Sequence, residues 1–70
     1  MTQYEISLMT DGSKLMVTEF YGSYVFQQKS FRSVLSAVKH VQQRVKLGSA
    51  IHPNCDALWM EWQAWADRCR

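Results

Sequence analysis

Apolar and polar residues alternate along the first part of the chain, with the period of two that is typical of a half-buried strand. The alternation is clearest in Tyr4–Met9. Asp11-Gly12 follows this segment and predicts a type I′ hairpin turn, because both central positions of that turn favour positive φ. A loop formed by these two residues would place Leu8 opposite Leu15, and the apolar side chains of both strands would then share one face.

A second hairpin turn, of type II′, is predicted at Gly22-Ser23. It would join a strand that ends near Tyr21 to one that begins at Tyr24. The inner face of the sheet would hold Tyr4, Ile6, Leu8, Leu15, Val17, Tyr21, Tyr24 and Phe26. Glu19 also falls on this face, which is inconsistent unless Glu19 lies at the periphery or a β-bulge shifts the register. The outer face would carry Met16, Thr18, Phe20, Val25 and Gln27.

The apolar residues of the outer face, Met16, Phe20 and Val25, form the first candidate binding surface. If both helices cover one face of the sheet, the other face meets water. Exposed apolar patches on small proteins often mark a surface for a protein partner. A terminus that covers these residues, or a register shifted by one position, is the alternative explanation.

The pattern changes to a helical period between Ser30 and Gly48. Ser30 is suited to the N-cap position, and Gly48 is suited to the left-handed conformation that follows a last helical turn. Apolar residues recur at spacings of three and four: Phe31, Val34, Leu35, Val38, Val41 and Val45. This stripe predicts a helix that packs on the sheet.

A second helix is predicted from Asn54, as its N-cap, to the C-terminus, because Pro53 disfavours helix at the residue before it. Its apolar stripe contains Cys55, Leu58, Trp59, Trp62, Trp65, Ala66 and Cys69. Aromatic residues at helical spacing usually fill a core. A homodimer through this Trp-rich C-terminal helix is the alternative.

Together these elements predict a single domain over residues 1–70, with an α+β fold: a three-stranded antiparallel β-meander followed by two α-helices packed on one face. A chain of 70 residues that is 47% apolar can build one core. The sequence shows neither a signal peptide nor an apolar run of membrane-spanning length, and Cys55 and Cys69 form no disulfide framework. We therefore expect a cytoplasmic protein with no membrane partner.

Positive charge is concentrated in the middle of the chain. Between Lys29 and Asn54 there are five cations and no acidic residue, although the whole chain has a net charge of only +2. Four of these cations belong to the predicted first helix and form the second candidate surface, the basic edge: Arg32, Lys39, Arg44 and Lys46. A basic edge suits nucleic-acid phosphates or an acidic partner, whereas a merely solvated helix face is the bland explanation.

The sequence contains no motif for catalysis, metal binding or cofactor binding. There is no CxxC or HxxxH pair, no GxGxxG, no P-loop and no GxSxG. His52 and Cys55 come closest to a nucleophile pair or a metal pair, but a lone thiol is more often buried and inert. We therefore expect a protein that is not an enzyme and has no cofactor and no metal.

The predicted function follows by elimination. It is that of a small non-enzymatic protein-binding module, an inhibitor or adaptor of a larger macromolecular complex, such as a phage or mobile-element accessory protein. The alternative is a nucleic-acid-binding protein that uses the basic edge.

Overall fold

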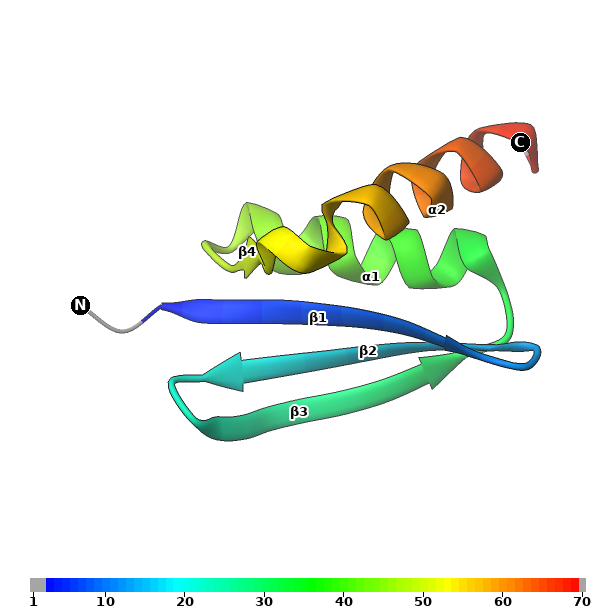
Figure 1. The fold of residues 1–70 in the computed structure, drawn as a ribbon. Helices are drawn as coiled ribbons and strands as arrows, with labels where there is room; N and C mark the ends of the chain where they lie inside the picture. Colours follow the sequence, from blue (N-terminus) through cyan, green and yellow to red (C-terminus); the bar gives the residue numbers. More distant parts are fainter. Residues whose placement is uncertain (1–2, 70) are drawn as a thin grey trace.

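The computed structural model describes residues 3–69 and contains an antiparallel β-meander with two helices on one of its faces (Figure 1). The strands are β1 (Tyr4–Asp11), β2 (Lys14–Tyr21) and β3 (Tyr24–Phe31). The helices are α1 (Val34–Lys46) and α2 (Asp56–Arg68). The predicted α+β fold, three antiparallel strands followed by two helices, is confirmed.

A short additional strand, β4 (Ala50–Ile51), lies beside β1 and was not expected. It pairs with β1 in parallel, so the strand order is β3-β2-β1-β4. The His52 N–H continues this pairing by donating to the Ile6 carbonyl at 2.9 Å. The 3₁₀ helix η1 (Pro53–Cys55) then leads into α2. A two-residue strand is too short to show a periodic pattern, which is why the sequence does not reveal it.

The core lies between the sheet and the two helices. The sheet contributes Ile6, Leu8, Leu15 and Val17, and the helices contribute Ala37, Val38, Val41, Trp62 and Ala66. Trp62 is the largest fully buried side chain, and Trp59 packs against the same cluster. Trp65, in contrast, is exposed, so only two of the three tryptophans on α2 pack in or against the core.

The first hairpin has a register two residues away from the predicted one. Its turn lies at Gly12-Ser13, where Gly12 has a φ of 62°, and Asp11 pairs with Lys14. Leu8 therefore lies opposite Val17, rather than opposite Leu15. Because a shift of two residues leaves every side chain on its original face, the predicted inner face is retained.

The second hairpin begins as predicted and then contains a β-bulge. Tyr21 pairs with Tyr24 and Phe20 with Val25, but the next pair is Glu19 with Gln27. Phe26 is the extra residue of the bulge. Gln27 consequently faces the helices, where its amide contacts Glu19, and its predicted place on the outer face is wrong.

Both helices begin later than the sequence suggests. Ser30 belongs to β3, and the N-cap of α1 is Ser33, whose hydroxyl accepts from the Ser36 N–H at 3.4 Å. Asn54 lies in η1, and α2 starts at Asp56. Each helix spans 13 residues. Within residues 3–69, no helix is long and apolar enough to cross a membrane.

Candidate functional site

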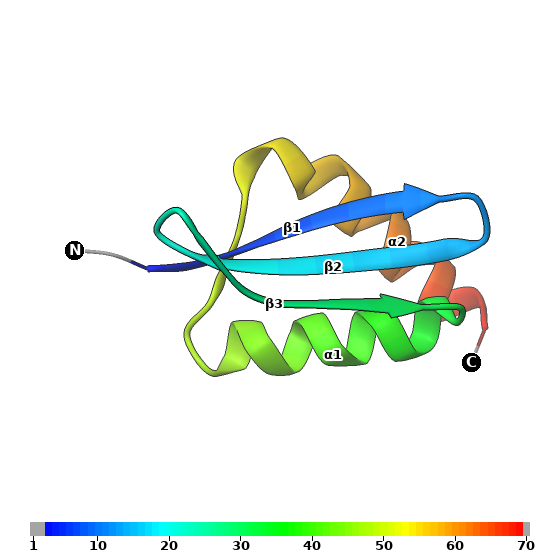
Figure 2. The ribbon, with the colours of Figure 1, turned by 90° about the horizontal axis from the view of Figure 1, so that it is seen from below.

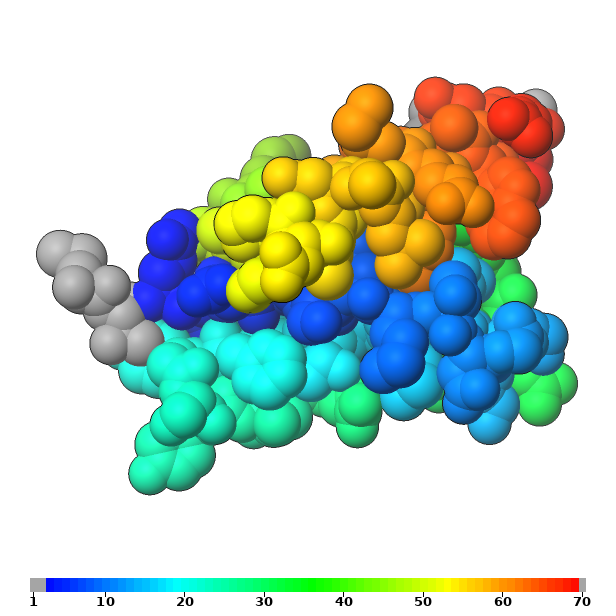
Figure 3. All heavy atoms as spheres, viewed as in Figure 1, coloured from blue at the N-terminus to red at the C-terminus, as the bar shows by residue number. Residues whose placement is uncertain are grey.

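Aromatic and aliphatic side chains gather at the end of the β2–β3 hairpin. We call this group the tip surface; it consists of Phe20, Tyr21, Tyr24, Val25 and Phe26. Tyr24 is 77% exposed, Val25 58% and Phe26 50%. In Figure 3 this end of the hairpin, coloured cyan to turquoise, projects at the lower left, away from the helices. The tip surface contains no charged residue.

The hairpin turn and the bulge together determine where these side chains lie. Gly22 has a φ of 63°, a conformation that favours glycine, and this permits the tight turn between Tyr21 and Tyr24. Phe26 lies on the same side of the sheet as the Tyr4 ring, and the bulge keeps Gln27 on that side as well. Val25 pairs with Phe20 on the other side. The end of the hairpin is therefore apolar on both faces.

Ring contacts hold the helix-facing half of the tip surface in place. The Tyr4 and Tyr21 rings are 4.6 Å apart between centroids, and the Tyr4 and Phe26 rings meet edge to face at 4.9 Å. Such aromatic pairs add about 0.5–1.5 kcal/mol beyond the burial of their surface. Tyr4 thus supports the tip surface from the neighbouring strand.

Beneath the rings, Glu19 is the centre of a buried hydrogen-bond network. Its Oε1 accepts from Arg44 Nε at 2.8 Å and from Gln27 Nε2 at 2.9 Å. Its Oε2 accepts from Arg44 Nη2 at 3.1 Å and from Ser49 Oγ at 2.5 Å. Burial by itself raises the pKa of Glu19, but these hydrogen bonds and the charge of Arg44 outweigh burial and hold the pKa below its ordinary value. Glu19 is therefore ionised at neutral pH.

Arg44 links this network to the tip surface. Its guanidinium carbon lies 5.7 Å from the centre of the Phe26 ring, within the range of a cation–π contact. The two hydrogen bonds to Glu19 fix the orientation of the guanidinium, and the bonding raises the pKa of Arg44. One face of the Phe26 ring therefore contacts a guanidinium that Glu19 of β2 holds in place. The rest of the ring is exposed to water.

The predicted outer-face surface is divided by the structure. Phe20 and Val25 are neighbours and belong to the tip surface. Met16 lies further along β2, paired with Met9 and Ser30, and is half-buried. Of the nine exposed large hydrophobic side chains in residues 3–69, four belong to the tip surface, whereas Met9 is the one that pairs with Met16.

The predicted basic edge is also divided. Arg32, Lys39 and Lys46 are exposed, whereas Arg44 is half-buried and forms an ion pair with Glu19. Lys39 and Lys46 are seven residues apart and thus share one side of α1. In the described part of the chain, neither of these two lysines forms an ion pair.

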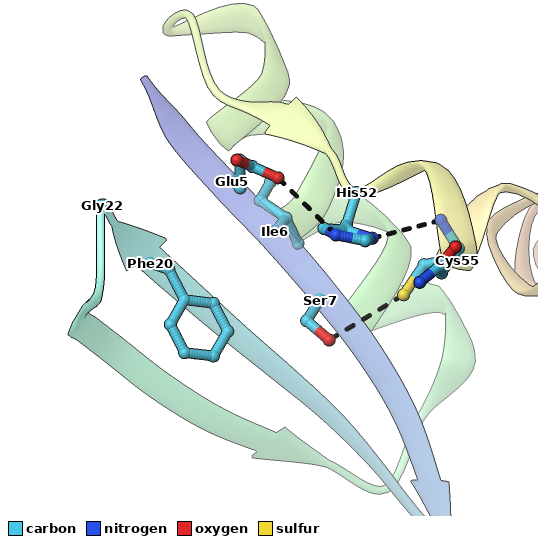
Figure 4. Close-up of a pocket in the computed structure, with 8 residues that line it drawn as sticks. Glu5, Ile6, Ser7, Phe20, Gly22, His52 and Cys55 are labelled. Carbon is cyan, nitrogen blue, oxygen red and sulfur yellow. Dashed lines mark hydrogen bonds and ion pairs between the residues drawn. The ribbon is translucent and has the colours of Figure 1, made fainter. Parts of the chain in front are cut away.

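A hollow of about 420 Å³ beside β1 and η1 brings together the residues that came closest to a catalytic pattern (Figure 4). The Cys55 thiol contacts the Leu8 backbone, at 3.4 Å from the N–H and 3.7 Å from the carbonyl, and lies 3.8 Å from Ser7 Oγ. His52 Nδ1 accepts from the Asn54 N–H at 3.2 Å. Glu5 Oε2 is 4.0 Å from His52 Nε2.

These contacts fasten η1 to β1. The thiol is directed at β1 backbone, and the Nδ1 lone pair of His52 is already occupied, so the geometry does not pair Cys55 with His52 as nucleophile and base. Within residues 3–69, no three His, Cys, Asp or Glu side chains are arranged to hold a metal ion.

Comparisons with protein-family models, with curated proteins and with solved structures found no match.

The sequence identifies part of this site. The Gly22-Ser23 turn and its flanking aromatic residues are readable, and Phe20 and Val25 were predicted as binding residues. Tyr21, Tyr24 and Phe26 were predicted to face inward, which suggested core residues rather than a surface. Their exposure arises because the hairpin extends past the helices, and that depends on the lengths and positions of all the elements (Figure 1).

Proposed function

We propose that this chain is a small non-enzymatic binding module that docks on another protein through the tip surface. The observation that carries this proposal is the concentration of exposed, uncharged aromatic side chains on one hairpin end. Aromatic residues are enriched at the centres of protein interfaces, where they supply much of the binding energy. A module of this size would act as an inhibitor or an adaptor of the complex that it binds.

The internal support of the tip surface favours the same function. Binding costs free energy whenever flexible side chains become ordered. Here Tyr4 and Arg44 already restrain Tyr21 and Phe26 before any partner arrives. The large exposed rings therefore lose less conformational freedom on docking than unsupported side chains would.

The test is affinity purification from the native host with nuclease present, using the unchanged chain, Tyr24→Ser and Phe26→Ser as baits. We expect both variants to lose a partner protein that the unchanged chain retains. Met60→Ser is the matched control, because Met60 is 69% exposed, between Phe26 and Tyr24, but lies on α2. Urea unfolding should show that Tyr24→Ser changes the free energy of unfolding by no more than about 0.5 kcal/mol. Retention of the partner by both tip variants would refute docking through the tip surface.

The exposed lysines of α1 support nucleic-acid binding as a second candidate. Lys39 and Lys46 share one exposed side of the helix. If they contact phosphates, binding to mixed DNA and RNA should weaken steeply with salt, and Lys39→Ala with Lys46→Ala should lower the slope of log K against log salt by about two. A complex that survives nuclease and is insensitive to salt excludes this function.

A further inference from the structure

The strand β3 forms a free edge of the sheet. It pairs with β2 on one side, and no described residue pairs with its other side. Beyond the bulge, the register from Gln27 to Phe31 is regular. Alternate residues of this segment therefore direct their backbone N–H and C=O groups away from the sheet, where another strand could bond to them.

The helix α1 overhangs this edge. Figure 2 shows the sheet from the side opposite the helices, and in this view α1 runs alongside β3 and outside it. In Figure 1 the same helix lies above the sheet. A strand added next to β3 would consequently lie beneath α1, with one of its faces covered. Edge strands are often covered by such a helix or shortened, but along Gln27–Phe31 the outer backbone groups of β3 pair with no described residue.

Lys29 places a positive charge on the helix-facing side of this edge. Lys29 pairs with the buried Val17, and paired residues share a face, so Lys29 lies on the side of the helices. His40 of α1 lies over the same face of β3, because its ring is 5.4 Å from the ring of Phe31, which shares that face with Lys29. Neither β3 nor α1 contains an acidic residue, and Glu19 of β2 is buried and bound by Arg44.

The charge distinguishes between two occupants of this edge. A second copy of the chain would bring its own β3, with another Lys29 and no acidic residue, so self-pairing would place like charges together. An extended segment with acidic side chains would instead meet Lys29 with opposite charge. Charge complementarity thus favours an acidic segment over a second copy.

We propose that the edge of β3 from Gln27 to Phe31 binds an extended acidic segment of a protein partner by strand addition. This inference rests on the proposed protein-binding function and specifies its mode, because the edge continues directly from the tip surface. Side chains alternate between the two faces of an added strand. Acidic residues at alternate positions would face Lys29 and His40, and the residues between them would lie beside Gln28 and Ser30 on the outer face.

The first test is selection of random peptides displayed on phage against the purified chain. We expect the selected peptides to carry Asp or Glu at alternate positions. Each is then synthesised with N-methyl groups on either the odd or the even backbone amides. Strand addition uses alternate amides, so one methylated form should lose binding and the other should retain it. Selection of neutral or basic peptides, or of none, overturns the proposal, as does equal tolerance of both methylated forms.

The second test uses charge-reversed variants of the chain. Lys29→Glu should weaken binding of a selected peptide about tenfold, because it places like charges across the new strand pair. Lys39→Glu carries the same charge change on the exposed side of α1 and should leave the affinity within about twofold. Equal effects of the two variants would attribute binding to net charge alone and would overturn strand addition, and so would a dimer of the unchanged chain that pairs through β3.

The outcomes separate this inference from the proposed function. If the native partner is lost with Tyr24→Ser but retained with Lys29→Glu, docking through the tip surface holds and strand addition fails. Loss with Lys29→Glu alone would support the edge and refute the tip surface as the docking site.

Discussion

Glu19 carries a buried carboxylate, and its side chain is only 1% exposed. Moving an isolated carboxylate out of water is costly, and it is tolerated here because both of its oxygens accept two hydrogen bonds each. The residues that bond to it come from β3, from α1 and from the segment before β4. Glu19 therefore connects three separate parts of the chain at one point.

Replacing this carboxylate with an amide should destabilise the fold. In Glu19→Gln the guanidinium of Arg44 loses its counter-charge, and the new amide N–H groups face donors. Breaking a buried pair typically costs 3–5 kcal/mol, and because Arg44 is 23% exposed we expect the lower end, about 3 kcal/mol. Urea unfolding measures this difference. Glu61→Gln is the control, since Glu61 is exposed on α2; equal stability of the two variants would contradict the described role of Glu19.

The same network predicts how stability depends on pH. The folded state lowers the pKa of Glu19 below its ordinary value of 4.5. Its ionised form is thus favoured by folding, so this contribution is fully present above the ordinary pKa and is lost as the pH falls through the lowered one. The unchanged chain should therefore lose more free energy of unfolding than Glu19→Gln between neutral pH and about pH 3. Parallel pH profiles for the two proteins would show that Glu19 is not the linked group.

At the scale of elements, periodicity determines faces more reliably than it determines ends and registers. The first hairpin is shifted by two residues, yet Ile6 and Leu8 remain on the inner face because strand side chains repeat with a period of two. The conflict of Glu19 with the inner face suggested a β-bulge as one explanation, but it does not locate the bulge at Phe26. In the structure Glu19 stays on the inner face, and α1 and β3 supply its hydrogen-bond partners.

The start of α1 shows why a local signal can mislead. Ser30 and Ser33 are both good N-cap residues, and the sequence alone does not separate them. The structure extends β3 through Phe31, because Phe31 pairs with Leu15 and packs against the core. The helix can then begin only after this strand, which leaves Ser33 as its N-cap.

The two serines can be separated by mutation. Ser33→Ala removes the side-chain acceptor of the Ser36 N–H and should lower the free energy of unfolding by about 0.5–1 kcal/mol, the low end for a cap because the bond is long at 3.4 Å. Ser30→Ala changes an exposed strand residue and should have an effect within about 0.5 kcal/mol. Thermal unfolding of both variants provides the measurement, and a larger loss for Ser30→Ala would place the cap at Ser30 after all.

At the scale of the whole molecule, the helices and the sheet are offset from each other. The core is built where the helices cover β1 and β2, whereas the β2–β3 end extends past that cover and the outer edge of β3 runs alongside α1 (Figures 1 and 2). The stabilising contacts and the candidate binding surfaces therefore occupy different parts of the molecule. Substitutions at the exposed tip residues can change binding without emptying the core.

Amide hydrogen exchange tests this division in a single experiment. An amide exchanges only after its hydrogen bond opens, and opening costs the most free energy in a buried strand that has a neighbour on both sides. The amides of β2, which pairs with β1 and β3, should therefore exchange most slowly. Along Gln27–Phe31, protection should alternate, because every second amide bonds to β2 and the others face solvent. The pattern should not change with protein concentration. Uniform protection along this segment that appears on concentrating the protein would mean that β3 pairs with a second copy, and the edge would not be free for an acidic partner strand.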